Sequence, residues 1–136
     1  MNTASKVLES YFSSSQSIGP ISCSTEEDLD SEVKNLLNAG IAGTPVGILE
    51  PEKKASGSTS YIRDAAVKAY ILIEAKGRCE RCNSKGPFIS ELNGLPYLEH
   101  HHVKHLSQGG SDTISNSVAV CPNCHRELHY LSLIHI

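Results

Sequence analysis

The sequence predicts an α+β fold: a small metal-stabilised domain in the second half of the chain, preceded by a helical and partly loop-rich region. Two cysteine pairs with CxxC spacing frame this second half, Cys79 with Cys82 and Cys121 with Cys124. Around the pairs, the apolar pattern changes from helical to strand-like spacing and back. The predicted order is therefore helix, cysteine turn, strand, loop, strand and helix.

A length of 136 residues fits one ordinary domain, or one small domain with a loosely built extension. The formal net charge of −3 is unevenly distributed along the chain. Residues 1–60 hold four Lys against eight acidic residues, whereas residues 61–136 hold eight Lys and Arg against seven. The second half is thus only weakly basic, and its charge alone would not indicate a nucleic-acid partner.

The sequence carries no signal for a membrane or for export. No apolar run approaches the ~18 to 20 residues that span a bilayer, and the start, MNTASKVLESYF, lacks the basic end and unbroken apolar stretch of a secretory signal. We therefore expect an intracellular, cytoplasmic protein. In a reducing compartment, paired cysteines bind metal more often than they form disulfides.

Residues 1–60 are predicted to be an accessory region. The segment TASKVLESYF has the spacing of a short helix. A second helix follows, with Ser24 and Glu27 as a capping-box pair and Gly40 as its stop. The rest of the region, from Gly40 to Ser60, is dense in Gly, Pro and Ser, which favours a linker.

Residues 61–130 hold the predicted domain. A helical stripe runs to Gly77, LPYLEHHHV is strand-like, SQGGSDTISN is a loop, SVAVC is a short strand, and Pro122 opens a final helix. The last six residues, LSLIHI, are what CTG TCT CTT ATA CAC ATC encodes, which resembles the end of a transposon-type sequencing adapter. We expect residues 131–136 to be an artefact and the natural C-terminus to be missing.

The cysteine quartet predicts a structural zinc site. A tight turn between cysteines two residues apart presents both thiolates to one ion, and two such turns supply the four sulfurs of a closed tetrahedral site. A redox CxxC occurs once, in a thioredoxin-like pattern that is missing here, and ferredoxin clusters use other spacings. Zinc would also help a domain of roughly seventy residues to hold its fold. The fifth cysteine, Cys23, has no partner motif and is expected to be an isolated thiol.

The histidines predict a second cation site. His125 and His129 lie four residues apart on the predicted helix, so they share one face and can reach one cation. Two solvated histidines are the plain alternative, but His125 directly follows Cys124, which favours a functional role. Further groups must come from elsewhere, and EHHH is the only dense supply. Strand parity leaves their roles open, because apolar residues fall on both faces of that strand.

These segments, GRCERC and PYLEHHHVKHLSQGGSDTISNSVAVCPNCHRELH, resemble the HNH endonuclease family. The resemblance is to the branch with a four-cysteine zinc site, found in modification-dependent restriction proteins. It rests on the double histidine after an acidic residue, the GG and D of the loop, the Asn that follows, and CPNCH. It runs from about residue 61 to His129 and does not cover residues 1–60. It implies a ββα-metal (His-Me finger) fold.

The resemblance also implies site residues and an activity. His101 and His125 would be ligands of a catalytic divalent ion, Mg, Mn, Ni or Zn, and His129 a further ligand or a phosphate contact. His102 would be the general base, and Asn116 would brace the loop and orient that base. The implied reaction is metal-dependent hydrolysis of DNA phosphodiester bonds, leaving 5′-phosphate and 3′-hydroxyl ends, as in a restriction-type enzyme.

The sequence departs from the family pattern at His100, where a small apolar residue is usual, and at His105, where Pro is frequent. We expect both to be surface or partly packed histidines. Glu99 either supports a ligand or is a solvated charge. The main alternative function is a zinc-stabilised nucleic-acid-binding module without cleavage, which predicts loss of catalytic residues that are all present. A RING or LIM interaction domain predicts more interleaved ligands.

Overall fold

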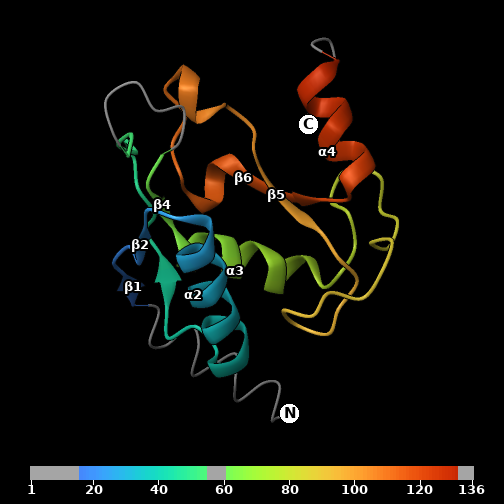
Figure 1. The fold of residues 1–136 in the computed structure, drawn as a ribbon, viewed down its shortest axis with the longest axis horizontal. Coiled ribbons are helices and arrows are strands. Elements are labelled where there is room, and N and C mark those ends of the chain that lie inside the picture. The colour runs from blue at the N-terminus through green and yellow to red at the C-terminus, as the bar shows by residue number, and fades with distance from the viewer. Residues whose placement is uncertain (1–15, 55–60, 132–136) are drawn as a thin grey trace.

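The computed structural model describes residues 16–54 and 61–131, in which three helices and short two-stranded sheets form a mixed α/β fold (Figure 1). The elements, in chain order, are β1 (Ser17–Ile18), β2 (Ser22–Cys23), α2 (Glu26–Ala39), β3 (Thr44–Pro45), β4 (Arg63–Asp64), α3 (Ala65–Ala75), β5 (Glu99–His102), two 3-10 turns (Leu106–Gln108 and Ile114–Asn116), β6 (Ser117–Val120) and α4 (Pro122–Tyr130). The predicted α+β class and element order are confirmed. The short helix expected at TASKVLESYF and residues 132–136 lie outside the described residues.

Helix α2 begins one residue later than the capping pattern predicted. Thr25, not Ser24, is the N-cap, because Thr25 has extended backbone angles and its Oγ1 accepts the backbone N–H of Asp28 at 3.0 Å. The predicted stop is confirmed: Gly40 has φ +90° and donates its N–H to the Leu36 carbonyl at 2.7 Å.

Removing the Thr25 hydroxyl should therefore destabilise the protein, whereas removing that of Ser24 should not. We expect Thr25→Ala to lower the free energy of unfolding by about 1 kcal/mol, the usual cost of losing an N-cap. Ser24→Ala, the matched control, should change it by under about 0.5 kcal/mol. Urea denaturation followed by circular dichroism measures both. Equal losses in the two variants would contradict the assignment of the cap.

Helix α3 is the centre of the core. It is capped by Asp64, whose Oδ1 accepts the backbone N–H groups of Ala66 and of Ile21, both at 2.9 Å. Its buried residues point in nearly all directions: Ala65, Ala66, Val67, Ala69, Ile71 and Leu72. The cause is that α2 packs on α3 from one side while β5 and β6 pack from another (Figure 1). A helix covered on several sides needs no single apolar stripe.

Strands β5 and β6 form an antiparallel pair in which His100 lies opposite Ala119 and His102 opposite Ser117. In Figure 1, α3 lies on one side of this pair and α4 on the other. Because side chains alternate along a strand, β5 divides its residues between two surroundings. Glu99 and His101 face α4, whereas His100 and His102 face α3 and the loop after β5.

The described part of residues 1–60 packs against the rest of the chain. Strands β1 and β3 pair in parallel, and β2 pairs with β4. Ile48 and Asp112 exchange two backbone hydrogen bonds, each 2.8 Å. One buried cluster holds Leu29 and Val33 of α2 together with residues of α3 and β6. The division into domains at residue 60 stays a prediction. Among the described helices, none has the length and apolar character needed to cross a membrane.

Candidate active site and cysteine cluster

The four predicted zinc ligands come together. Cys79 and Cys82 follow α3, and Cys121 and Cys124 lie at the start of α4. Their four sulfur atoms all lie within 4.8 Å of one another. Each pair forms a tight turn in which a backbone N–H points to the first sulfur, from Cys82 to Cys79 at 3.4 Å and from Cys124 to Cys121 at 3.5 Å. This donor set has the composition and spacing of a structural zinc site.

The thiols of this cluster differ strongly in acidity. Hydrogen bonds to the side chain and backbone of Ser84 lower the pKa of Cys82 to about 6, whereas burial raises the pKa of Cys124 to about 12. Four sulfurs so close together cannot all carry a negative charge without a cation between them. The arrangement therefore suits a divalent metal that holds all four as thiolates.

The first cysteine turn is attached to both β6 and α4. Glu80 exchanges hydrogen bonds with the backbone of Ala119, at 2.7 and 2.9 Å, and Arg81 forms an ion pair with Glu127 at 2.7 Å. The side chain of Cys121 also caps α4. The cluster consequently fixes the start of the helix that carries His125, the residue next to Cys124.

A second cluster unites His101, His125 and His129. One ring nitrogen of each lies within 4.8 Å of the other two, and the Nε2 atoms of His125 and His129 are 3.0 Å apart. His101 is 4% exposed, and its Nδ1 is buried without a hydrogen-bond partner. A buried imidazole nitrogen without a hydrogen-bond partner, on a ring that lies in a cluster of three histidines, suits a metal ligand.

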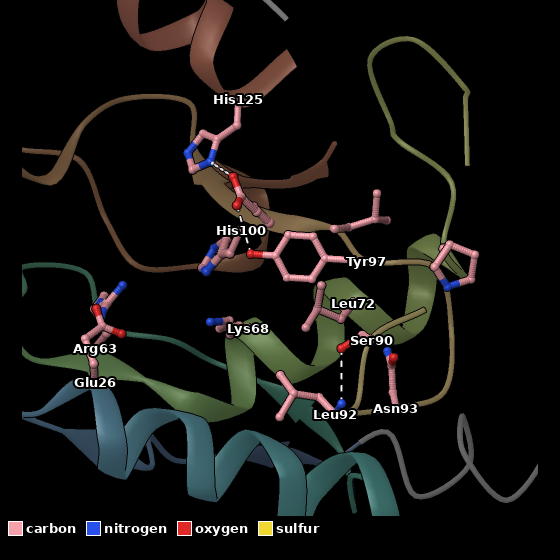
Figure 2. Close-up of a pocket in the computed structure, with 14 residues that line it drawn as sticks. Glu26, Arg63, Lys68, Leu72, Ser90, Leu92, Asn93, Tyr97, His100 and His125 are labelled. Carbon is pink, nitrogen blue, oxygen red and sulfur yellow. Dashed lines mark hydrogen bonds and ion pairs between the residues drawn. The ribbon is translucent and has the colours of Figure 1, made fainter. Parts of the chain in front are cut away.

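Two side chains support His125 from behind. Nδ1 of His125 donates to Glu99 at 2.8 Å, and the hydroxyl of Tyr97 donates to the other carboxylate oxygen, also at 2.8 Å (Figure 2). The hydrogen bond at Nδ1 fixes the ring and leaves Nε2 free to bind. Of the two roles open for Glu99 in the sequence, the contacts favour the supporting one.

The pKa shifts in this cluster favour neutral imidazoles at His101 and His129 and a charged carboxylate at Glu99. Burial, then the neighbouring His125 and His129, lowers the pKa of His101 to about 4. Burial opposes ionisation of Glu99, but the hydrogen bonds from His125 and Tyr97 outweigh it and lower its pKa. Burial and the hydrogen bond to Glu99 raise the pKa of Tyr97 to about 12. A metal requires the neutral form of its imidazole ligands.

His102 lies on the other face of β5, away from these rings. Its Nε2 is 2.8 Å from Oδ1 of Asp112, a residue that is 0% exposed. His100 shares this face, with its Nε2 2.8 Å from the hydroxyl of Ser117. Burial, then His102 and Lys68, lowers the pKa of His100 well below its ordinary value. His100 is thus held within the fold and does not join the first cluster.

Asn116 braces the loop between the two strands. Its Oδ1 accepts the backbone N–H of Lys104 at 2.8 Å, and its Nδ2 donates to the carbonyls of Lys104 and Ser111 at 2.9 and 2.7 Å. Its own carbonyl accepts the N–H of Val103, at 2.9 Å. The contacts with Val103 and Lys104 lie one and two residues after His102, so Asn116 fixes the end of the strand that carries His102.

Sequence reasoning missed three neighbours of the site. His105, expected to be a bystander, has its ring centre 5.7 Å from that of His101 and 5.0 Å from that of His129. No spacing signal could have found it, because β5 ends at His102 and the chain then bends, so side-chain directions follow no regular period there. Asp112 was noted only as a family motif, and Asp64 was not singled out, because isolated carboxylates give no periodic pattern.

Two hollows meet at Glu99 and His125. The first, about 190 Å³, lies between α3, β5 and the loop before β5, and includes Lys68, Tyr97 and His100 (Figure 2). The second, about 700 Å³, lies along α4 and includes Arg126 and His129. The histidine cluster therefore borders a wide surface hollow that carries a cationic side chain.

Comparison with known proteins agrees with this arrangement. Residues 79–131 match the family model of the HNH endonucleases. The chain is 47% identical over 105 residues to the type IV methyl-directed restriction enzyme EcoKMcrA of Escherichia coli (strain K12). That match covers 77% of this chain and 37% of the relative, so the chain spans well under half of that protein's length.

Among solved structures, the chain is similar to the type IV phosphorothioation-dependent restriction endonuclease ScoMcrA. The TM-score is 0.46 and the sequence identity 24%, over 78% of this chain and 19% of that one. The family match and the 47% identity to the Escherichia coli enzyme together show that this chain contains an HNH endonuclease domain at residues 79–131.

Proposed function

We propose that this protein is a metal-dependent endonuclease that hydrolyses DNA phosphodiester bonds in a restriction-type role. The observation that carries the proposal is the cluster of His101, His125 and His129, whose ring nitrogens lie within 4.8 Å of one another beside a surface hollow. Kinship with a restriction enzyme supports DNA as the substrate.

Two metals have separate roles in this proposal. Cys79, Cys82, Cys121 and Cys124 hold a structural zinc, and His101, His125 and His129 hold a catalytic divalent cation. A cation bound by these imidazoles would polarise the scissile phosphate and stabilise charge on its departing oxygen. The unpartnered, buried Nδ1 of His101 fits such a ligand. Imidazole ligands suit Zn or Ni, while Mn and Mg would depend more on water and phosphate oxygens.

His102 is the general base in this mechanism. Its imidazole takes a proton from water, the water oxygen attacks phosphorus, and the bond from phosphorus to the 3′ oxygen breaks. Asn116 keeps the end of β5 rigid, so that the ring of His102 stays oriented toward the attacking water. Arg126 lines the hollow beside His125 and His129, where its guanidinium can contact a phosphate.

A plasmid-cleavage assay tests the proposal. The zinc-loaded protein is incubated with methylated and unmethylated supercoiled plasmid and with Mg, Mn, Ni or Zn, and gel electrophoresis separates nicked and linear products. We expect cleavage with at least one ion. We expect no cleavage after a chelator has removed the more weakly bound catalytic cation but left the structural zinc in place. A folded, zinc-loaded protein that binds plasmid but cleaves none with any ion would instead support the binding-module alternative.

Glu99 should control the affinity of the histidine cluster. Replacing it with Gln removes the charge that holds His125 Nδ1, and we expect the affinity for Mn or Ni to fall about 10- to 100-fold. Glu127→Gln is the matched control, because Glu127 lies on α4 but pairs with Arg81. Calorimetric titration of the zinc-loaded protein measures both. Equal affinity in Glu99→Gln and the wild type would argue against His125 as a ligand.

A further inference from the structure

We infer that Asp112 is the positioning residue of the general base, and that the segment before residue 61 holds Asp112 in place. The inference rests on the proposed role of His102. Asp112 is fully buried, and its Oδ1 lies 2.8 Å from Nε2 of His102. Among the described residues, Asp112 provides the carboxylate that is hydrogen-bonded to the His102 ring.

The contact selects one tautomer of His102. A carboxylate only accepts hydrogen bonds, so Nε2 carries the proton and donates to Asp112. Nδ1 then keeps its lone pair, and it is the atom that takes the proton from water. The same logic applies to a carboxylate that orients an imidazole base in hydrolases of other folds.

Both oxygens of Asp112 are engaged, which makes the carboxylate immobile. Oδ2 accepts the backbone N–H of Asp64 at 2.6 Å, at the residue that caps α3. An amide at this position would supply one acceptor for two donors. Because the N–H of Asp64 cannot reverse, the amide NH₂ would face His102 and push its proton from Nε2 to Nδ1.

The backbone of Asp112 is held by the N-terminal segment. Its N–H and C=O pair with those of Ile48, at 2.8 Å in each direction. Gly47, with φ +76°, allows this approach: a Cβ there would lie 2.4 Å from the Asp112 carbonyl oxygen. Gly47 and Ile48, which precede position 60, thus help to set the orientation of His102 by holding Asp112. Asp112 itself contacts the His102 ring.

The first experiment compares wild type with Asp112→Asn in the full, zinc-loaded chain. Two-bond ¹H–¹⁵N correlation spectra of ¹⁵N-histidine protein report the tautomer, with His102→Gln identifying the signal. We expect Nε2–H in the wild type and Nδ1–H in the variant. The cleavage kcat should fall about 10²- to 10⁴-fold, with little change in KM or zinc content.

An unchanged tautomer in Asp112→Asn, or Nδ1–H in the wild type, would overturn the inference. This readout needs no cleavage, so an inactive wild type would count against the proposed function while the tautomer still decides the role of Asp112. A kcat equal to that of the wild type would likewise overturn the positioning role.

A second variant acts on the anchor and leaves the Asp112 side chain intact. Gly47→Ala should displace the Asp112 backbone, mix the His102 tautomers and lower kcat at least 10-fold. Gly19→Ala is the control, since no atom lies within 4 Å of a Cβ built there, and it should match the wild type. A Gly47→Ala protein with the wild-type tautomer and kcat would show that the N-terminal segment plays no part.

Discussion

Replacing His102 with Ala should lower the cleavage rate about 10²- to 10⁴-fold, the usual contribution of a general base. The cause is loss of the proton acceptor, because His102 lies on the face of β5 opposite the proposed metal ligands. Zinc content and the affinity of the histidine cluster for Mn or Ni should therefore stay at wild-type values. Single-turnover cleavage of plasmid at saturating metal measures the rate.

Two further variants separate base chemistry from packing. His102→Gln keeps a donor for Asp112 but cannot accept a proton, so it should be as slow as His102→Ala. Activity in the Gln variant alone would mean that the ring is structural. His100→Ala removes the hydrogen bond with Ser117 and a packing contact with the His102 ring, but no proton acceptor, and should change the rate by less than 10-fold. If His100 proved essential and His102 dispensable, the assignment along β5 would be wrong by two positions.

Replacing Cys121 with Ser should have the largest effect on stability. Structural zinc sites contribute about 10 to 16 kcal/mol of apparent binding free energy in zinc-finger peptides, whereas whole domains are stable by only about 5 to 15 kcal/mol. Loss of zinc should thus unfold the second half of the chain. The Ser hydroxyl can still cap α4, but the metal link between the two cysteine turns would be lost, and with it the fixed position of His125. Elemental analysis and thermal melting by circular dichroism measure the outcome.

Cys23→Ser is the matched control for that variant. Cys23 is buried outside the cluster, and a hydroxyl can replace its contact with the Ile21 carbonyl. It should keep one zinc per chain and melt close to the wild type. Full zinc content in Cys121→Ser, with an unchanged melting temperature, would exclude the four-cysteine site.

Much of the fold follows from local sequence. The stop of α2 at Gly40, Pro122 at the start of α4 and both cysteine turns depend on neighbouring residues, and the structure agrees with each. The start of α2 differed by one position, because Ser24 and Thr25 both have cap chemistry and backbone angles decide between them.

The site was less predictable where it depends on distant contacts. The pair His125 and His129 could be found from helical spacing alone. By contrast, the face of β5 that each histidine takes depends on α3 and α4, and apolar residues on both faces gave no guide. Asp112, the partner of His102, lies ten residues along an irregular loop, and Asp64 pairs with Ile21 and Asp112 at separations of 43 and 48 residues. Single-sequence patterns encode neither kind of contact.

The pairing of Ile48 with Asp112 has a consequence for protein engineering. A chimaera that joins a foreign DNA-binding module at residue 61 would cut away the strand partner of Asp112 and leave two backbone groups without hydrogen bonds. A fusion point ahead of β1 retains that partner and Gly47 with it. The segment that must be transferred into a chimaera is therefore longer than the segment that carries the cysteine and histidine motifs.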